Sequence, residues 1–245
     1  MCSMTRTFIA VGCCMLVLLN TIPNAYAALT ISTTRLVYNS EQRNLSVVIA
    51  NPSQHLYAGQ AWVNTQSDDT TTFVPIIATP ALFKLAPGKE RTVRLSSLPN
   101  NLPTDRESLF FFNLQEIPAA QEKQKNTLTI ALRTRIKLFY RPSQLTVDPI
   151  ESLKALRFSI PSVNHQRYLR VHNPTPFHYT FSRLDLSDAD QRYSVPDADM
   201  ISPMSEHDYP LPAGISLKGL NVVFSVINDY GGNSSSLTLP VQTTP

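Results

Sequence analysis

The chain has 245 residues, of which 42% are hydrophobic, and its formal net charge is +3. This length exceeds the usual size of one β-sandwich domain, about 100 residues, and suits two. The charged residues are mixed along the chain without a basic block, which argues against nucleic-acid binding.

Residues 1–27 have the pattern of a secretory signal peptide. Arg6 supplies the positive start, and an apolar run follows from Phe8 to Leu19. Ala25-Tyr26-Ala27 has the spacing of a cleavage site, so we expect an exported mature chain that begins at Ala28. The apolar run is shorter than the about 20 residues of a membrane-spanning helix, so no membrane insertion is expected.

All three cysteines, Cys2, Cys13 and Cys14, lie within this segment. Cys13 leaves a lipoprotein cleavage site open as a minor alternative. Cleavage after Ala27 leaves a mature chain without thiols, which excludes disulfides, cysteine catalysis and zinc sites with cysteine ligands.

The first half of the mature chain consists of short β-like runs separated by turn residues. Strands are expected over residues 29–38, 45–50, 58–64, 90–95 and 107–115. Trp62 is expected in the core because tryptophan buries a large area. The polar segment from Glu116 to Asn126 is expected to be a loop. Helical patterns of useful length are absent, so this half is predicted to be all-β.

The longest pattern runs from Thr127 to Pro142. Its apolar residues share one parity and its polar residues the other, which is the two-residue period of a β-strand; the apolar set is Leu128, Ile130, Leu132, Ile136 and Leu138. At about 3.3 Å per residue this run spans roughly 50 Å, far more than an ordinary strand. Its length suggests a use beyond ordinary sheet pairing.

A linker is expected over residues 143–149, between Pro142 and Pro149. It divides an N-terminal domain, 28–142, from a C-terminal domain, 150–245. Further short runs are expected over 156–160, 167–171, 177–186, 195–200, 219–228 and 237–241. The sequence therefore predicts an all-β chain of two β-sandwiches.

Four motifs resemble, in order, those of the PapD-like periplasmic chaperones of chaperone-usher pilus assembly. They are I-A-T-P at 77–80, L-P-T-D-R-E-S-L-F-F-F-N-L-Q-E-I-P at 102–118, I-K-L-F-Y-R-P at 136–142 and I-N-D-Y-G-G at 227–232. The resemblance covers nearly all of the mature chain. It implies two immunoglobulin-like domains in an L-shaped arrangement, with a cleft between them that holds an incomplete pilus subunit.

The resemblance implies that the long strand completes the subunit's sheet, with Leu128, Ile130 and Leu132 filling its groove. Main-chain hydrogen bonds then supply affinity and alternate side chains supply specificity. The alternative is that these side chains face their own core. Arg35 and Lys137 match the family's anchor for the subunit's C-terminal carboxylate, which sets the register of the bound strand. Taken singly, each is more simply explained as a solvated surface charge, and it is the match of both to family positions that favours the anchor.

A third implied feature is a structural ion network between the domains, formed by Glu107, Arg141 and Asp229. The alternative is a turn aspartate and two exposed charges.

The short 116–126 segment and the lack of mature cysteines resemble the short-loop branch of the family. The implied partners are pilin or fimbrial subunits and the outer-membrane usher, with a self-capping dimer possible for the free chain.

Two other functions are alternatives to a chaperone. An enzyme is disfavoured because H-E-x-x-H, G-x-S-x-G and glycine-rich phosphate motifs are missing. His165, His172 and His178 are more simply surface residues than metal ligands, so neither metal nor cofactor is expected. A pilus subunit or adhesin is the alternative within the same pathway, but such subunits typically have one domain that lacks a strand.

Overall fold

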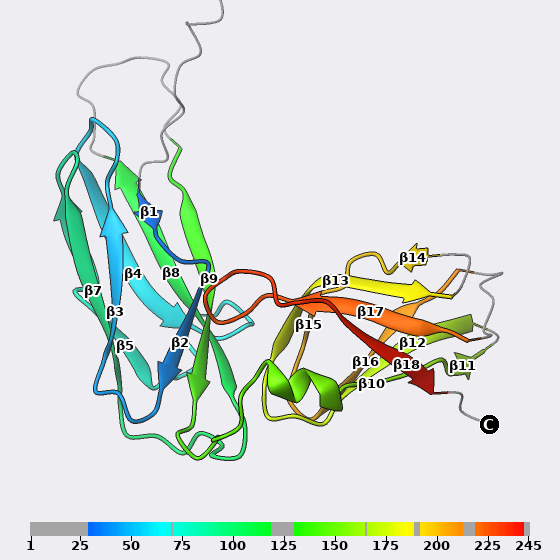
Figure 1. The fold of residues 1–245 in the computed structure, drawn as a ribbon. Helices are drawn as coiled ribbons and strands as arrows, with labels where there is room; N and C mark the ends of the chain where they lie inside the picture. The colour runs from blue at the N-terminus through cyan, green and yellow to red at the C-terminus, as the bar shows by residue number, and fades with distance from the viewer. Residues whose placement is uncertain are drawn as a thin grey trace, which may run out of the picture.

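The computed structural model describes residues 29–69, 71–118, 130–164, 166–188, 192–212 and 219–242. These residues form two β-sandwich domains that meet at a corner, so that the molecule is L-shaped (Figure 1). The one helical element among them is the short 3-10 helix η1 (Glu151–Ala155), which follows the connection between the domains. The prediction of an all-β chain with two sandwiches is confirmed.

The N-terminal domain packs two sheets face to face. The first has the order β1-β3-β7-β5, formed by β1 (Thr30–Ile31), β3 (Leu45–Ala50), β7 (Glu90–Ser97) and β5 (Ile76–Thr79). The second has the order β2-β9-β8-β4-β6, formed by β2 (Arg35–Asn39), β9 (Arg133–Arg141), β8 (Ser108–Pro118), β4 (Tyr57–Asn64) and β6 (Leu82–Leu85). Alternate apolar side chains of both sheets fill the core between them, among them Val47, Ile49, Val93, Phe112 and Leu138.

The C-terminal domain has a core of its own and nine strands among the described residues. They are β10 (Arg157–Ser159), β11 (Ser162–Val163), β12 (Gln166–Asn173), β13 (Tyr179–Ser187), β14 (Arg192–Ser194), β15 (Met200–Ile201), β16 (Ser205–Pro210), β17 (Asn221–Val226) and β18 (Leu237–Gln242). Its core is rich in aromatic side chains, including Phe158, Phe181 and Phe224. Within it, Phe224 packs against both Phe158 and Phe181.

Two predicted strands differ from the structure, and one observed strand was not predicted. The run 29–38 is divided between β1 and β2, which lie in different sheets, and polar residues 32–34 connect them. The run 195–200 is mostly a turn with Asp197 at φ +52°, and only Met200 is in a strand. Strand β16 was not predicted, because S-E-H-D-Y-P is polar. It forms through full-length antiparallel pairing with β12.

Three further predictions in the N-terminal domain need correction. Strand β9 begins at Arg133, and residues 130–132 before it are not in a strand. Trp62 is only partly buried, because it lies on the outer face of its sheet, where the Arg133 guanidinium covers it at 4.9 Å from the ring centroid. Residues 116–118, assigned to a loop, extend β8. No helix in the described part of the chain is long and apolar enough to cross a membrane.

Candidate functional site

Strands β2 and β9 place two cationic side chains next to each other at the corner of the L. These strands pair in parallel, and their register sets Arg35 opposite Lys137. The even-numbered neighbours Leu36 and Leu138 enter the core. Because side chains alternate along a strand, Arg35 and Lys137 project from the opposite face, toward the C-terminal domain.

Arg35 is largely buried, with 7% of its surface exposed. Its Nη1 donates a hydrogen bond to the Ile227 carbonyl oxygen at 2.7 Å, while its buried Nε has no hydrogen-bond partner. No ion pair among the described residues includes this guanidinium. Burial lowers the pKa of Arg35, and the negative charges of Asp229 and Glu107 oppose that shift.

Lys137 reaches across to the C-terminal domain. Its Nζ donates a hydrogen bond to Thr180 Oγ1 at 3.1 Å and lies 3.5 Å from an oxygen of Asp199. The Asp199 side chain is 83% exposed, so its attraction is weakened by solvent. Burial lowers the pKa of Lys137, and nearby Arg35 lowers it further, whereas Asp199 raises it. The corner therefore holds two partly desolvated cations and little compensating charge.

Arg141 connects the domains directly beside this pair. Its Nε donates to Glu107 Oε1 at 2.8 Å, and Nη1 and Nη2 donate to the two carboxylate oxygens of Asp229 at 2.7 and 3.0 Å. The Glu107 side chain is only 2% exposed. Burial opposes the charge of Arg141, but Asp229 and Glu107 outweigh it and raise its pKa. The three residues expected in a network thus lie together.

Sequence reasoning missed a fourth residue of this network. The backbone N–H of His178 donates to Glu107 Oε2 at 2.9 Å, and the His178 ring nitrogen Nδ1 lies 3.2 Å from the same oxygen. His178 lies outside the four motifs, and the sequence around it does not indicate this contact. Asp199 and Thr180 were missed for the same reason, since their proximity to Lys137 arises only from the docking of the two domains.

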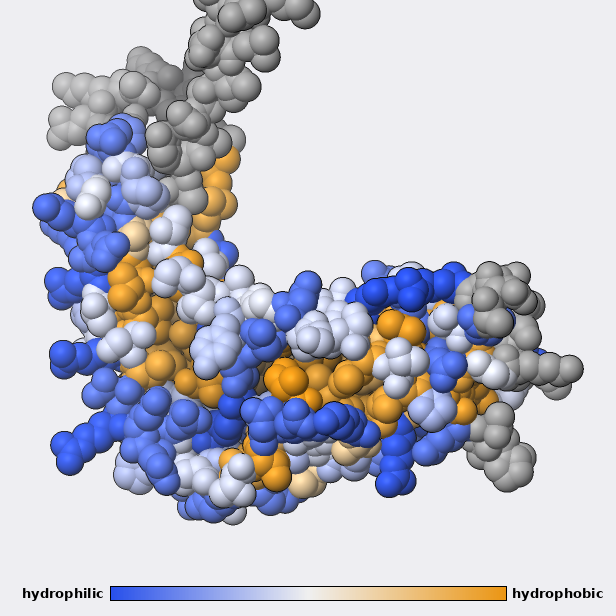
Figure 2. Space-filling view, in the orientation of Figure 1, coloured by the Kyte–Doolittle hydropathy of each residue, from blue (hydrophilic) through white to orange (hydrophobic). Residues whose placement is uncertain are grey.

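An exposed apolar segment precedes β9. Ile130 is 63% exposed and Leu132 is 55% exposed, whereas Leu128 lies outside the described residues. In Figure 2, hydrophobic surface lies along the concave side of the N-terminal domain, near the start of β9. Ile130 and Leu132 are therefore not buried in the core of their own domain.

Within the part of the chain that the structure describes, no strand pairs with the edge of β9 beside this segment, which is called the open edge below. Toward β8, the Leu132 carbonyl accepts a hydrogen bond from the Glu116 N–H at 3.0 Å, and the Leu132 N–H donates to Glu116 Oε1 at 3.2 Å. On the other side, β2 pairs only with residues 137–141 of β9. Because backbone groups alternate in direction along an antiparallel pair, those of Arg133 and Arg135 face this open edge.

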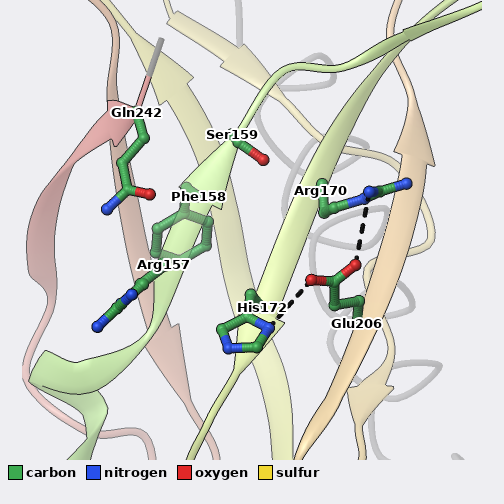
Figure 3. A pocket seen from close by; sticks show the side chains of 7 residues that line it. All are labelled: Arg157, Phe158, Ser159, Arg170, His172, Glu206 and Gln242. Carbon is green, nitrogen blue, oxygen red and sulfur yellow. Dashed lines mark hydrogen bonds and ion pairs between the residues drawn. The ribbon is translucent and has the colours of Figure 1, made fainter. Parts of the chain in front are cut away.

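A hollow lies on the C-terminal domain, over β10, β12, β16 and β18. Figure 3 shows its polar rim, in which Arg170 and His172 both face Glu206. Arg170 also forms a two-pronged ion pair with Asp208, at 2.7 Å for each hydrogen bond. The charge of Arg170 is therefore neutralised within the domain, which makes the hollow a weaker candidate for ligand binding than the corner.

The histidines weighed as metal ligands do not lie together. His172 faces Glu206, whereas His178 faces Glu107 at the corner, and His165 lies outside the described residues. Throughout the described ranges, no group of three or more histidine, cysteine, aspartate or glutamate side chains is arranged to hold a metal ion.

Comparison with protein families assigns both domains. The model described as "Pili and flagellar-assembly chaperone, PapD N-terminal domain" matches residues 28–146, and that described as "Pili assembly chaperone PapD, C-terminal domain" matches residues 151–238. The chain belongs to the PapD family of pilus-assembly chaperones. The resemblance drawn from the four motifs is thereby confirmed.

Individual relatives agree with this assignment. The chain is 38% identical to the chaperone protein PapD of Escherichia coli over 218 residues, which is 86% of each chain. It is 33% identical to the chaperone protein LpfB of Salmonella typhimurium over 232 residues, which is 93% of this chain and 96% of the relative. A crystal structure of the YadV chaperone has a TM-score of 0.74 and 33% identity, covering 87% of this chain and all of that one. These relatives support a chaperone and not a pilus subunit or adhesin.

Proposed function

We propose that this chain is a periplasmic, non-enzymatic chaperone that holds pilus subunits by lending them the segment before β9. The observation that carries the proposal is the pairing of Arg35 with Lys137 at the corner, next to an exposed apolar segment with an open strand edge. A subunit that lacks a strand needs what this arrangement offers, which is backbone hydrogen bonds and alternate apolar side chains.

The proposed anchor uses the charge of the two cations. Arg35 has an unpartnered Nε, and the ionic partner of Lys137 is a highly exposed aspartate. A subunit's C-terminal carboxylate would supply the missing negative charge and accept hydrogen bonds from both side chains. Fixing the end of the subunit chain also fixes the register of its strand against β9. Leu128, Ile130 and Leu132 then face the subunit groove, and no metal or cofactor takes part.

The experiment is co-expression with pilin subunits encoded beside this chain, followed by purification of complexes from the periplasm. The wild type should yield a soluble one-to-one complex, and Arg35→Ala and Lys137→Ala should lose it. Arg91→Ala is the matched control, because Arg91 is an exposed cation on β7. Thermal unfolding of each free variant checks that the fold is retained. Equal subunit protection by wild type and both anchor variants would refute the proposal.

Export, release and self-association belong to the same proposal. The chain should be recovered from the periplasm with Ala28 as its first residue, which N-terminal sequencing tests. The complex should bind the outer-membrane usher, which a pull-down with the usher tests. The free chain should form a self-capping dimer through its open β9 edge, and light scattering with and without bound subunit measures that dimer.

A further inference from the structure

The first residue of β9 is held by a polar cluster to which neither the motifs nor the family match assigns a role. Arg133 follows directly after the exposed segment 130–132 and points from the opposite side of the strand. Its Nη1 donates to Asp68 Oδ2 at 3.0 Å, and its Nη2 contacts the other oxygen of the same carboxylate. This is the two-pronged geometry in which guanidinium and carboxylate bind most specifically.

The same guanidinium closes a network of buried amides. Arg133 Nε and Nη2 both donate to Asn113 Oδ1, at 3.0 and 2.6 Å. The Asn113 amide donates in turn to Asn64 Oδ1 at 2.9 Å, and the Asn64 amide donates to Asp68 Oδ1 at 2.6 Å. Asn113 is 0% exposed and Asn64 is 4% exposed. Two buried side-chain amides are thus satisfied in one closed ring of hydrogen bonds, which a missing partner would leave incomplete.

A second arginine ties the same loop to the same strand. Arg135 Nη2 donates to the carbonyl oxygens of Thr65 and Gln66, at 2.7 and 3.2 Å, and its guanidinium lies 3.8 Å from the centroid of the Phe111 ring. The loop closes on itself through the Asp68 N–H, which donates to the Thr65 carbonyl at 3.2 Å. Arg133 and Arg135, which lie on the face of β9 opposite to Leu132, therefore both hydrogen-bond to the 65–68 loop.

We propose that Asp68 and Arg133 form a clamp that fixes where β9 begins and thereby positions the preceding segment for subunit binding. This inference rests on the proposed function. In segment 130–132 the apolar side chains of Ile130 and Leu132 are exposed, and among the described residues no strand pairs with its outer edge, and its hydrogen bonds to β8 are made at Leu132. A segment that is ordered before binding loses less conformational freedom on binding, and the complex is correspondingly tighter. Arg133 and Asp68 act as positioning residues without touching the subunit groove.

The test is a double-mutant cycle with Asp68→Ala, Arg133→Ala and the combined variant. The probe is the pilin subunit that co-purifies with the wild-type chain. We expect each single variant to bind the subunit about tenfold more weakly, and the combined variant to be no weaker than either single one. In the free chain, amide hydrogen exchange at residues 130–132 should become faster, while exchange in the C-terminal domain stays unchanged. Arg133→Lys should restore only part of the affinity, because an ammonium lacks the planar fork.

Three outcomes separate this inference from the proposed function. Weaker binding together with faster exchange at 130–132 supports the clamp. Unchanged affinity in the clamp variants, with binding still lost in Arg35→Ala and Lys137→Ala, overturns the clamp and leaves the proposed function standing. Additive losses, or a loss that simply follows a lowered melting temperature of the whole chain, also overturn the clamp, because they indicate a general effect on the fold.

Discussion

At the scale of single residues, the corner is defined by the imbalance of charge around Arg35 and Lys137. Both side chains are partly desolvated, and burial lowers the pKa of each. A buried cation without a close anion is unfavourable on its own, and a carboxylate arriving from outside relieves that cost. The desolvated cations that lower the stability of the free chain would therefore favour the binding of a carboxylate.

The lowered pKa of Lys137 predicts a pH dependence of subunit binding. The Lys137 amine must be protonated to bind a carboxylate. A bound carboxylate would raise the pKa of Lys137 again, so binding takes up protons at alkaline pH. Affinity should therefore be full at neutral pH and fall as the pH rises through the free chain's lowered lysine pKa. Titrating the dissociation constant from neutral to pH about 10.5 measures this. Lys137→Arg should flatten the alkaline fall, and an equal fall in that variant would contradict the assignment to Lys137.

Asp199 is the residue that a subunit carboxylate would have to compete with. It lies 3.5 Å from Lys137 Nζ and is 83% exposed, so the exchange of one anion for another requires little rearrangement. We expect Asp199→Asn to bind subunits severalfold more tightly, as measured by competition between variant and wild-type chaperone for one subunit. Asp197→Asn on the same turn is the control. Weaker binding by Asp199→Asn would mean that Asp199 orients Lys137 instead.

At the scale of elements, the proposed function divides β9 and the segment before it into two parts. The second half of β9 pairs with β2 and β8 and buries Ile136 and Leu138. The segment before β9 contacts β8 through the backbone and side chain of Glu116 and through the side chain of Gln115. The division falls where β2 stops pairing, at Lys137, so the open edge begins where the anchor ends.

Two leucines of this stretch give a matched comparison. Leu132→Ser removes a side chain that is 55% exposed, so the free energy of unfolding should change by less than about 0.5 kcal/mol while subunit binding falls. Leu138→Ala removes a side chain that is 0% exposed, and should cost about 2 to 5 kcal/mol of stability. Urea unfolding and complex yield measure both. A stability loss in Leu132→Ser as large as that in Leu138→Ala would show that Leu132 belongs to the core.

At the scale of the whole molecule, a small ion network, most buried at Glu107, joins the two domains. Glu107 accepts hydrogen bonds from Arg141 and His178, and the Glu107 N–H donates to the Pro176 carbonyl oxygen at 2.9 Å. Asp229 approaches from the other side at the edge of the network and is 38% exposed. The members of this network therefore differ in how far they are removed from solvent.

This difference predicts unequal effects of substitution. Arg141→Leu leaves the buried Glu107 carboxylate without its cation and should cost about 3 to 5 kcal/mol. Asp229→Asn removes a partly exposed partner and should cost about 1 kcal/mol or less. Chemical unfolding gives the free energies, and small-angle X-ray scattering tests whether Arg141→Leu broadens the distribution of interdomain angles. Similar costs for both variants would indicate that Glu107 does not need Arg141.

The sequence by itself determined the features that depend on local pattern. The two-residue period of Ile136 and Leu138, the turn residues between the runs and the four motifs were sufficient for the all-β class, the two sandwiches and the family. These features depend on residues close together in the chain, so they can be read without knowing which strands pair. The expected anchor and network residues were named by resemblance, and their roles remain proposals.

Only the tertiary structure decided which distant residues meet. The parallel register of β2 and β9 brings Arg35 beside Lys137, and domain docking brings His178 to Glu107 and Asp199 to Lys137. Polar β16 is a strand because β12 pairs with it, and Trp62 is half-buried because Arg133 covers it. Such contacts arise from sheet register and domain packing across long separations in the chain. The alternation of apolar and polar residues along a strand is the same whichever strand it pairs with. It therefore carries no information about these long-range contacts.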